Sequence, residues 1–121
     1  MAVSDFKKQE GYFLEEVSID VISIRDLVAI AINNNKVNLT RNEFILALNF
    51  LDYLVQKYPI KFLKGPEMVR IHKSTTEFKK WLLKKWDAGK YNDIDFGIWL
   101  DMDEQDIPSE YRLDKAITEK E

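Results

Sequence analysis

The stretch TRNEFILALNFLDYLVQKY, residues 40–58, decides the fold of this chain. Thr40 followed by Glu43 is a capping-box pattern, which is typical of the first turn of a helix. Apolar residues then recur at helical spacing around most of the circumference, and Pro59 disfavours helical geometry in the residue before it. The stretch therefore predicts a buried helix, about 28 Å long at the usual rise per residue. Its narrow polar strip consists of Asn42, Asn49, Asp52 and Gln56.

The residues before this helix predict two helices and a strand. Residues 4–14 have the pattern of a short helix, and residues 16–21 alternate between apolar and polar side chains, which predicts a half-buried strand. Ser23 with Asp26 three positions later predicts the start of a second helix, and the asparagines from Asn33 onward predict its end.

After the central helix the pattern predicts a β-hairpin and a third capped helix. Residues 60–63 and 68–73 have strand character, and the turn residues Lys64-Gly65-Pro66-Glu67 lie between them. Ser74 with Glu77 is a second capping box, and the helix that follows is expected to end near Gly89 in a left-handed cap.

The last third predicts a strand and a terminal helix. Residues 93–102 alternate in hydrophobicity and are expected to complete the sheet. Pro108 is expected to open a short helix, followed by a charged tail that the fold does not need. The fold class is therefore α+β: one helix-rich domain over residues 1–121 with a small antiparallel sheet, in which residues 1–107 form the compact core and 108–121 the short helix and tail.

Composition excludes several classes of function. The chain has no cysteine, which excludes thiol catalysis, disulfides and thiolate zinc sites. No secretory signal and no bilayer-spanning stretch are evident, so we expect a cytoplasmic protein without membrane contact. His72 is the only histidine, glycine-rich phosphate loops are missing, and residues 101–112 lack the spacing of a calcium loop. We therefore expect no enzyme activity, no cofactor and no metal.

Charge is distributed unevenly along the chain, although the net charge is only −3. Between Lys57 and Lys90 there are ten Lys or Arg residues against three acidic residues. From Tyr91 to the end there are ten Asp or Glu residues against three basic ones. This asymmetry indicates an anion-binding middle and an acidic terminal third that solubilises the chain, shields it or binds a basic partner.

The expected order from residue 4 to residue 73 is helix, strand, helix, helix, strand, strand. That order resembles the winged-helix DNA-binding proteins, in which two helices form a helix-turn-helix motif and a β-hairpin forms the wing. The order from residue 23 to residue 89 also resembles that of excisionase-like and MerR-like proteins. The resemblance covers about two-thirds of the chain and rests on element order, without a signature motif. It implies that the helix at residues 40–58 occupies the recognition position.

The candidate DNA-binding residues follow from this resemblance and from the basic middle of the chain. In the first turn of the recognition helix, Arg41 and Asn42 have side chains suited to base edges. If the hairpin and the next helix lie side by side, their cations form one patch that faces phosphate, although a solvated lysine-rich face is the alternative. The residues of this patch are Lys61, Lys64, Arg70, Lys73, Lys79, Lys80, Lys84 and Lys85.

The tryptophans divide into two groups. Trp81 and Trp86 fall toward the apolar side of their helix, where packing is the expected role. Trp99 lies on the polar side of the predicted strand, so it is either covered by another element or exposed as a partner contact.

Two functions fit these patterns. The first is a small cytoplasmic DNA-binding protein with a regulatory or accessory role, of the kind that plasmids and phages encode. The alternative is a protein-interaction module, such as an inhibitor, antitoxin or immunity-type protein, that binds through its acidic C-terminal third.

Overall fold

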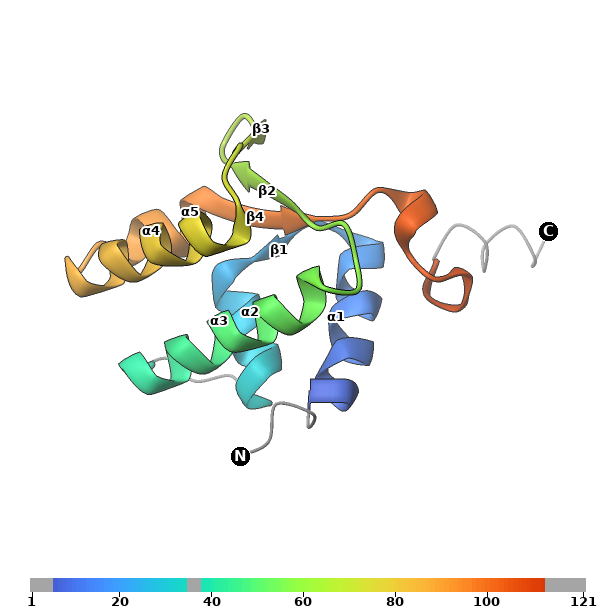
Figure 1. Ribbon diagram of the computed structural model, residues 1–121, viewed down its shortest axis with the longest axis horizontal. Coiled ribbons are helices and arrows are strands. Elements are labelled where there is room, and N and C mark those ends of the chain that lie inside the picture. The colour runs from blue at the N-terminus through green and yellow to red at the C-terminus, as the bar shows by residue number, and fades with distance from the viewer. Residues whose placement is uncertain (1–5, 35–37, 113–121) are drawn as a thin grey trace.

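A computed structural model describes residues 6–34 and 38–112, without the side chains of Asn92, Asp95 and Phe96. The chain is an α+β protein in which helices pack beside a small sheet (Figure 1). The α-helices are α1 (Lys7–Ile19), α2 (Ile24–Ile32), α3 (Arg41–Val55), α4 (Thr75–Asp87) and α5 (Tyr91–Gly97). The strands are β1 (Ile22–Ser23), β2 (Lys61–Lys64), β3 (Val69–Arg70) and β4 (Ile98–Asp101). Two 3-10 turns, η2 (Glu104–Asp106) and η3 (Ser109–Tyr111), follow β4.

The sheet is antiparallel throughout and has the order β1-β4-β2-β3. β2 and β3 form the predicted hairpin, with β2 displaced by one residue from the predicted 60–63 and β3 shorter than the predicted 68–73. β4 lies between β1 and the hairpin, with Leu100 opposite Ile22 on one side and Phe62 on the other. The order of elements that carries the winged-helix resemblance is present, but β4 separates the first strand from the hairpin (Figure 1).

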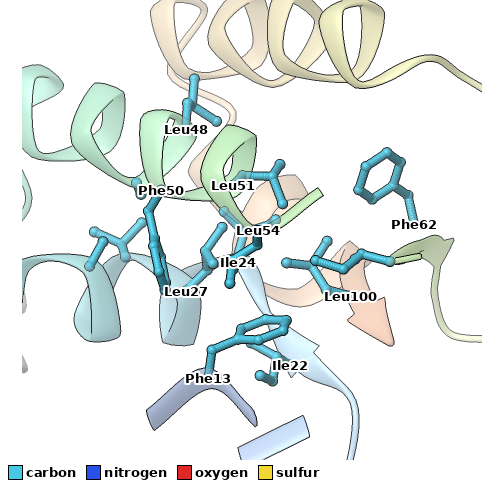
Figure 2. Packing of buried hydrophobic residues seen from close by; sticks show 14 of the residues in the cluster. Phe13, Ile22, Ile24, Leu27, Leu48, Phe50, Leu51, Leu54, Phe62 and Leu100 are labelled. Carbon is cyan, nitrogen blue, oxygen red and sulfur yellow. The ribbon is translucent and has the colours of Figure 1, made fainter. Parts of the chain in front are cut away.

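α3 is the central core helix that the sequence predicts. Phe44, Phe50, Leu51 and Leu54 are at most 1% exposed. Figure 2 shows Leu54 of α3 beside Ile24 of α2 and Leu100 of β4, whereas Leu48 points to the opposite side of α3. The helix ends at Val55, three residues earlier than the predicted end at Tyr58. Within the described residues, every helix is too short or too polar to span a bilayer.

The helix starts are set by local hydrogen bonds. The Thr40 hydroxyl accepts from the backbone N–H of Glu43, whose carboxylate accepts from the N–H of Thr40, as the capping box predicts. Ser74 and Glu77 make the same pair of bonds at the start of α4. Ser23 caps α2 in the predicted way. The predicted ends are confirmed as well, because Asn33 and Gly89 both adopt positive φ.

The strand predicted at residues 16–21 is wrong. α1 continues to Ile19, and the strand β1 is displaced to Ile22–Ser23. The burial pattern is helical, because Phe13, Leu14 and Val17 are buried while Ile19 is 66% exposed. The apolar-polar alternation therefore described a helix end and not a sheet face.

The strand predicted at residues 93–102 is correct only in its second half. Residues 91–97 form α5, and pairing in the sheet begins at Ile98. Ile94 and Ile98 are both buried, and their spacing of four fits a helical turn as well as it fits alternation. β4 nevertheless completes the sheet, as expected.

The region after β4 belongs partly to the core. Ile107 is 4% exposed, and Tyr111 packs against the core cluster. The Arg112 guanidinium donates to the carbonyls of Ile107 and Gln105, which fixes the path of the chain there. Of the helix predicted to open at Pro108, the described part is the 3-10 turn η3, after which Arg112 is extended; the rest of the predicted helix and the charged tail lie outside the described residues. The fold therefore includes Tyr111 and Arg112, which lie beyond the predicted compact core of residues 1–107.

Candidate nucleic-acid interface

α4 contacts the hairpin near its first turn, through one pair of aromatic rings. The Phe62 ring of β2 stacks on the Phe78 ring of α4, with 3.9 Å between centroids and an interplanar angle of 2°. Both rings are buried. This contact fixes α4 against the sheet because it joins the apolar faces of the two elements.

Two cations lie close to the Trp81 ring of α4 at the surface. The Lys73 ammonium, from the segment between β3 and α4, lies 5.6 Å from the centroid of the Trp81 ring. The Lys85 ammonium, one turn further along α4, lies 5.0 Å from the same ring. These cation–π contacts hold two positive charges beside one half-buried indole.

Three of the eight predicted patch cations, all lysines, are held by acidic partners. Lys61 lies 2.6 Å from Asp103 and 4.0 Å from Asp101. Lys79 contacts the carboxylate of Asp52 on α3. These pairs compensate the lysine charges, which leaves Lys61 and Lys79 less available to phosphate. Lys85 is also paired, with Asp93 at 3.7 Å, in addition to its contact with Trp81.

Five predicted cations are exposed and form no ion pair with the described part of the chain. We call them the hairpin–α4 surface: Lys64, Arg70, Lys73, Lys80 and Lys84. Arg70 and Lys73 line the same shallow hollow beside the hairpin. Lys80 and Lys84 are one turn apart on the outward side of α4, as predicted from their spacing.

Two exposed acidic residues lie on the same elements, Glu67 in the hairpin turn and Glu77 in the first turn of α4. Glu77 has a shifted pKa. Its carboxylate accepts a hydrogen bond from the backbone of Ser74, which is the main reason that its pKa lies below the ordinary value. The charges of Lys73 and Lys80 lower the pKa of Glu77 further. The negative charge of Glu77 therefore offsets part of the positive charge of Lys73 and Lys80.

The predicted base-reading residues lie apart from this surface. The Arg41 guanidinium donates to both carboxylate oxygens of Asp87, at 2.9 and 3.2 Å. This pair ties the first turn of α3 to the far end of α4, away from the hairpin (Figure 1). Asn42 is exposed beside it. The rest of α3 packs one face into the core, and beyond the first turn its polar strip exposes Asn49.

Trp86 has the packing role that the sequence predicts, and Trp99 is half-buried within the sheet. Trp86 stacks on Phe44, with 4.6 Å between centroids, and meets the Tyr91 ring edge-on. Trp99 is half-buried in β4, where its cross-strand neighbours are Ser23 and Leu63. Trp99 thus lies in the middle of the sheet and is not among the exposed large hydrophobic side chains of the described residues.

A cluster that the sequence does not predict joins α1 to the end of α3. The Glu10 carboxylate accepts from the Tyr53 hydroxyl at 2.6 Å, from the Lys57 ammonium at 2.8 Å, and from the Tyr58 hydroxyl. Glu10 is only 8% exposed. Because its partners are more than 40 positions away in the sequence, no local spacing could have indicated them.

The environment of this cluster shifts the pKa values of its members in opposite directions. Burial raises the pKa of Glu10, but hydrogen bonds from Lys57, Tyr53 and Tyr58 outweigh it and leave the pKa below its ordinary value. Burial and the hydrogen bond donated to Glu10 raise the pKa of Tyr58 to about 12. The cluster therefore stabilises the fold when the Glu10 carboxyl group is ionised.

Within residues 6–34 and 38–112, no group of three His, Asp or Glu side chains is placed to hold a metal ion. Comparison of the chain with protein-family models, with curated proteins and with solved structures finds no match in any of the three.

Proposed function

We propose that the protein binds duplex DNA by contacts between its hairpin–α4 surface and backbone phosphates. The observation that supports this proposal is the set of five exposed cations on the hairpin, on α4 and in the segment between them, where the Phe62–Phe78 ring stack joins the two elements. Four of the five are lysines, which act as point charges toward phosphate. A regulatory or accessory role on DNA is consistent with such a surface.

Binding of this kind has little sequence preference. Arg41 is engaged by Asp87, and the exposed α3 side chains suited to base edges are few, Asn42 and Asn49. Affinity then comes from the release of counterions, which predicts a steep loss of binding as salt concentration rises. We expect a dissociation constant of about micromolar at low salt.

A titration of a fluorescent duplex at several salt concentrations tests the proposal. In the double variant Lys80→Ala/Lys84→Ala, we expect weaker binding to every sequence. The slope of the logarithm of the binding constant against the logarithm of the salt concentration should be about two units less steep in the variant than in the wild type, if each lysine contacts one phosphate. The matched control is Lys7→Ala/Lys8→Ala, which removes the same charge from exposed positions on α1.

Equal losses in the two double variants indicate a general charge effect and contradict a defined surface. Unchanged binding in Lys80→Ala/Lys84→Ala contradicts the proposal directly. A preference of the wild type for one duplex sequence that Arg41→Ala or Asn42→Ala abolishes indicates groove reading by α3, contrary to the phosphate-only mode.

The second candidate is the protein-interaction module that binds through the acidic C-terminal third. The observation in its favour is a hollow at the end of β4 that Asp101 and Glu104 line together with Asp20 of the N-terminal region. This candidate predicts little duplex binding at physiological salt and no effect of Lys80 or Lys84, so the same titration separates the two.

A further inference from the structure

The outward side of α1 exposes apolar side chains. Ile19 is 66% exposed and Tyr12 is 38% exposed, and they are two of the five large hydrophobic side chains that are exposed in the described residues. Their spacing of seven places them on one face of the helix. The opposite face packs into the core through Phe13, Leu14 and Val17.

Acidic residues surround these two side chains. Glu15 and Glu16 lie between Tyr12 and Ile19, Asp20 follows the helix, and all three are exposed. We call these five residues the α1 acidic face: Tyr12, Glu15, Glu16, Ile19 and Asp20. No basic residue lies within this stretch of α1. The face is thus apolar at two points and negatively charged between and beside them.

Shallow hollows border the face on both sides. Tyr12, Glu15 and Glu16 share one hollow with Ala29 and Ile30 of α2. Ile19 and Asp20 share the other with residues at the end of β4. Arg112 also lines the second hollow, but its guanidinium donates to the carbonyls of Ile107 and Gln105 at 2.7 and 2.8 Å. A partner can therefore contact the exposed side chains of α1 and also fill the hollows on both sides of the helix.

We propose that the α1 acidic face is a docking surface for a basic protein, whose apolar side chain packs on Tyr12 and Ile19. Charge complementarity selects this occupant, because Lys and Arg of the partner pair with Glu15, Glu16 and Asp20. Phosphate-bearing ligands are repelled by the same carboxylates, and two copies of this face repel each other. The proposal is independent of DNA binding, since the face shares no residue with the hairpin–α4 surface.

Selection from a random peptide library displayed on phage tests this proposal. We expect enriched peptides that combine Lys or Arg with a large apolar residue. Labelled synthetic copies are then titrated against variants of the full chain. Ile19→Ser and Glu16→Lys should each weaken binding about tenfold, as expected when a central apolar contact or a complementary charge is lost.

Two substitutions on the hairpin are the matched controls. Val69→Ser changes a side chain that is 60% exposed, and Glu67→Lys makes the same charge change at another exposed position. Neither should alter peptide affinity. Because all four positions are exposed, circular dichroism melts should show that every variant is folded.

Three outcomes of the peptide experiment overturn the proposal: enriched peptides that are acidic, peptides whose affinity Ile19→Ser leaves unchanged, and equal losses in the hairpin controls.

Self-association of the wild-type protein, measured by light scattering at low salt, is a fourth outcome that can overturn it. If Ile19→Ser and Lys80→Ala/Lys84→Ala both abolish it, the face binds the hairpin–α4 surface of a second copy instead of a different protein.

Discussion

The contact between α1 and α3 and the contact between α4 and the hairpin both combine aromatic rings with charged groups, but at different depths. Between α1 and α3, the Glu10 carboxylate is 8% exposed and accepts three hydrogen bonds. Between α4 and the hairpin, buried rings make the contact, while Lys73 lies exposed beside Trp81.

The buried carboxylate and the exposed ammonium differ in what they contribute to stability and to binding. A buried carboxylate with three donors contributes to stability because its loss leaves the donors without an acceptor. An exposed ammonium keeps its water and contributes little to the fold, but it remains available to an anionic ligand. The first contact is therefore expected to govern unfolding, and the second to govern binding.

The largest effect is expected from Leu51→Ala, in the core that both contacts share. Leu51 is completely buried, so truncation removes apolar contacts and leaves a cavity. We expect a loss of about 2–5 kcal/mol in the free energy of unfolding, measured by urea denaturation. A loss below about 1 kcal/mol contradicts the central position of α3, because surface substitutions fall in that range.

Glu10→Ala breaks the first contact and should cost about 1–3 kcal/mol of unfolding free energy, because the Tyr53 and Tyr58 hydroxyls lose their acceptor. Lys73→Ala makes a comparable truncation at the second contact and should leave the urea midpoint unchanged. Glu10→Gln, which keeps an acceptor, should fall between Glu10→Ala and the wild type. Equal effects of Glu10→Ala and Lys73→Ala contradict the comparison.

The contact between Glu10 and Tyr58 should make the stability of the protein depend on pH in both the acid and the alkaline range. The pKa of Glu10 is lowered on folding, so its contribution is present above the ordinary value of 4.5 and is lost as pH falls through the folded value. The pKa of Tyr58 is raised from 10.0 to about 12, so its contribution is present below pH 10 and is lost as pH rises through 12.

Tyr58→Phe should therefore remove part of the alkaline loss of stability between pH 10 and pH 12. At neutral pH the substitution should cost about 0.5–1.5 kcal/mol, the net value of one hydrogen bond. Thermal melts of wild type and variant across this pH range provide the measurement. Parallel alkaline curves for the two proteins would show that Tyr58 does not titrate with folding.

The smallest effect, and one of opposite sign, is expected from Gly11→Ala in α1. A Cβ at this position meets the Tyr111 hydroxyl at 3.5 Å, which is an ordinary contact. Alanine therefore fits, and its higher helix propensity should stabilise the protein by about 0.5–1 kcal/mol. A destabilised variant would indicate that the packing of α1 against η3 is tighter than this distance implies.

Features set by local chemistry were predictable from the sequence. The capping boxes at Thr40 and Ser74 depend on residues three positions apart, so their partners are visible in the sequence itself. The left-handed caps at Asn33 and Gly89 are equally local. These signals placed α2, α3 and α4, of which α4 carries Lys80 and Lys84 of the hairpin–α4 surface.

Features set by tertiary contacts were not predictable in the same way. Val17 fits both strand alternation and the helical stripe of α1, and only packing against the core decides between them. The acceptors of Lys61 and Lys79 come from distant segments, so the sequence could not show which cations of the patch are compensated. For the same reason it could not show that Arg41 is engaged by Asp87.

The central position of β4 has a consequence for the order in which the protein assembles during synthesis. β1 is made early, but its partner residues Trp99 and Leu100 leave the ribosome only after most of the chain. Until then β1 and the inner edge of β2 expose unpaired backbone groups, while the helices and the β2–β3 hairpin can form from neighbouring residues. Closure of the sheet is therefore a late event, and a nascent chain that stalls before β4 has two open strand edges.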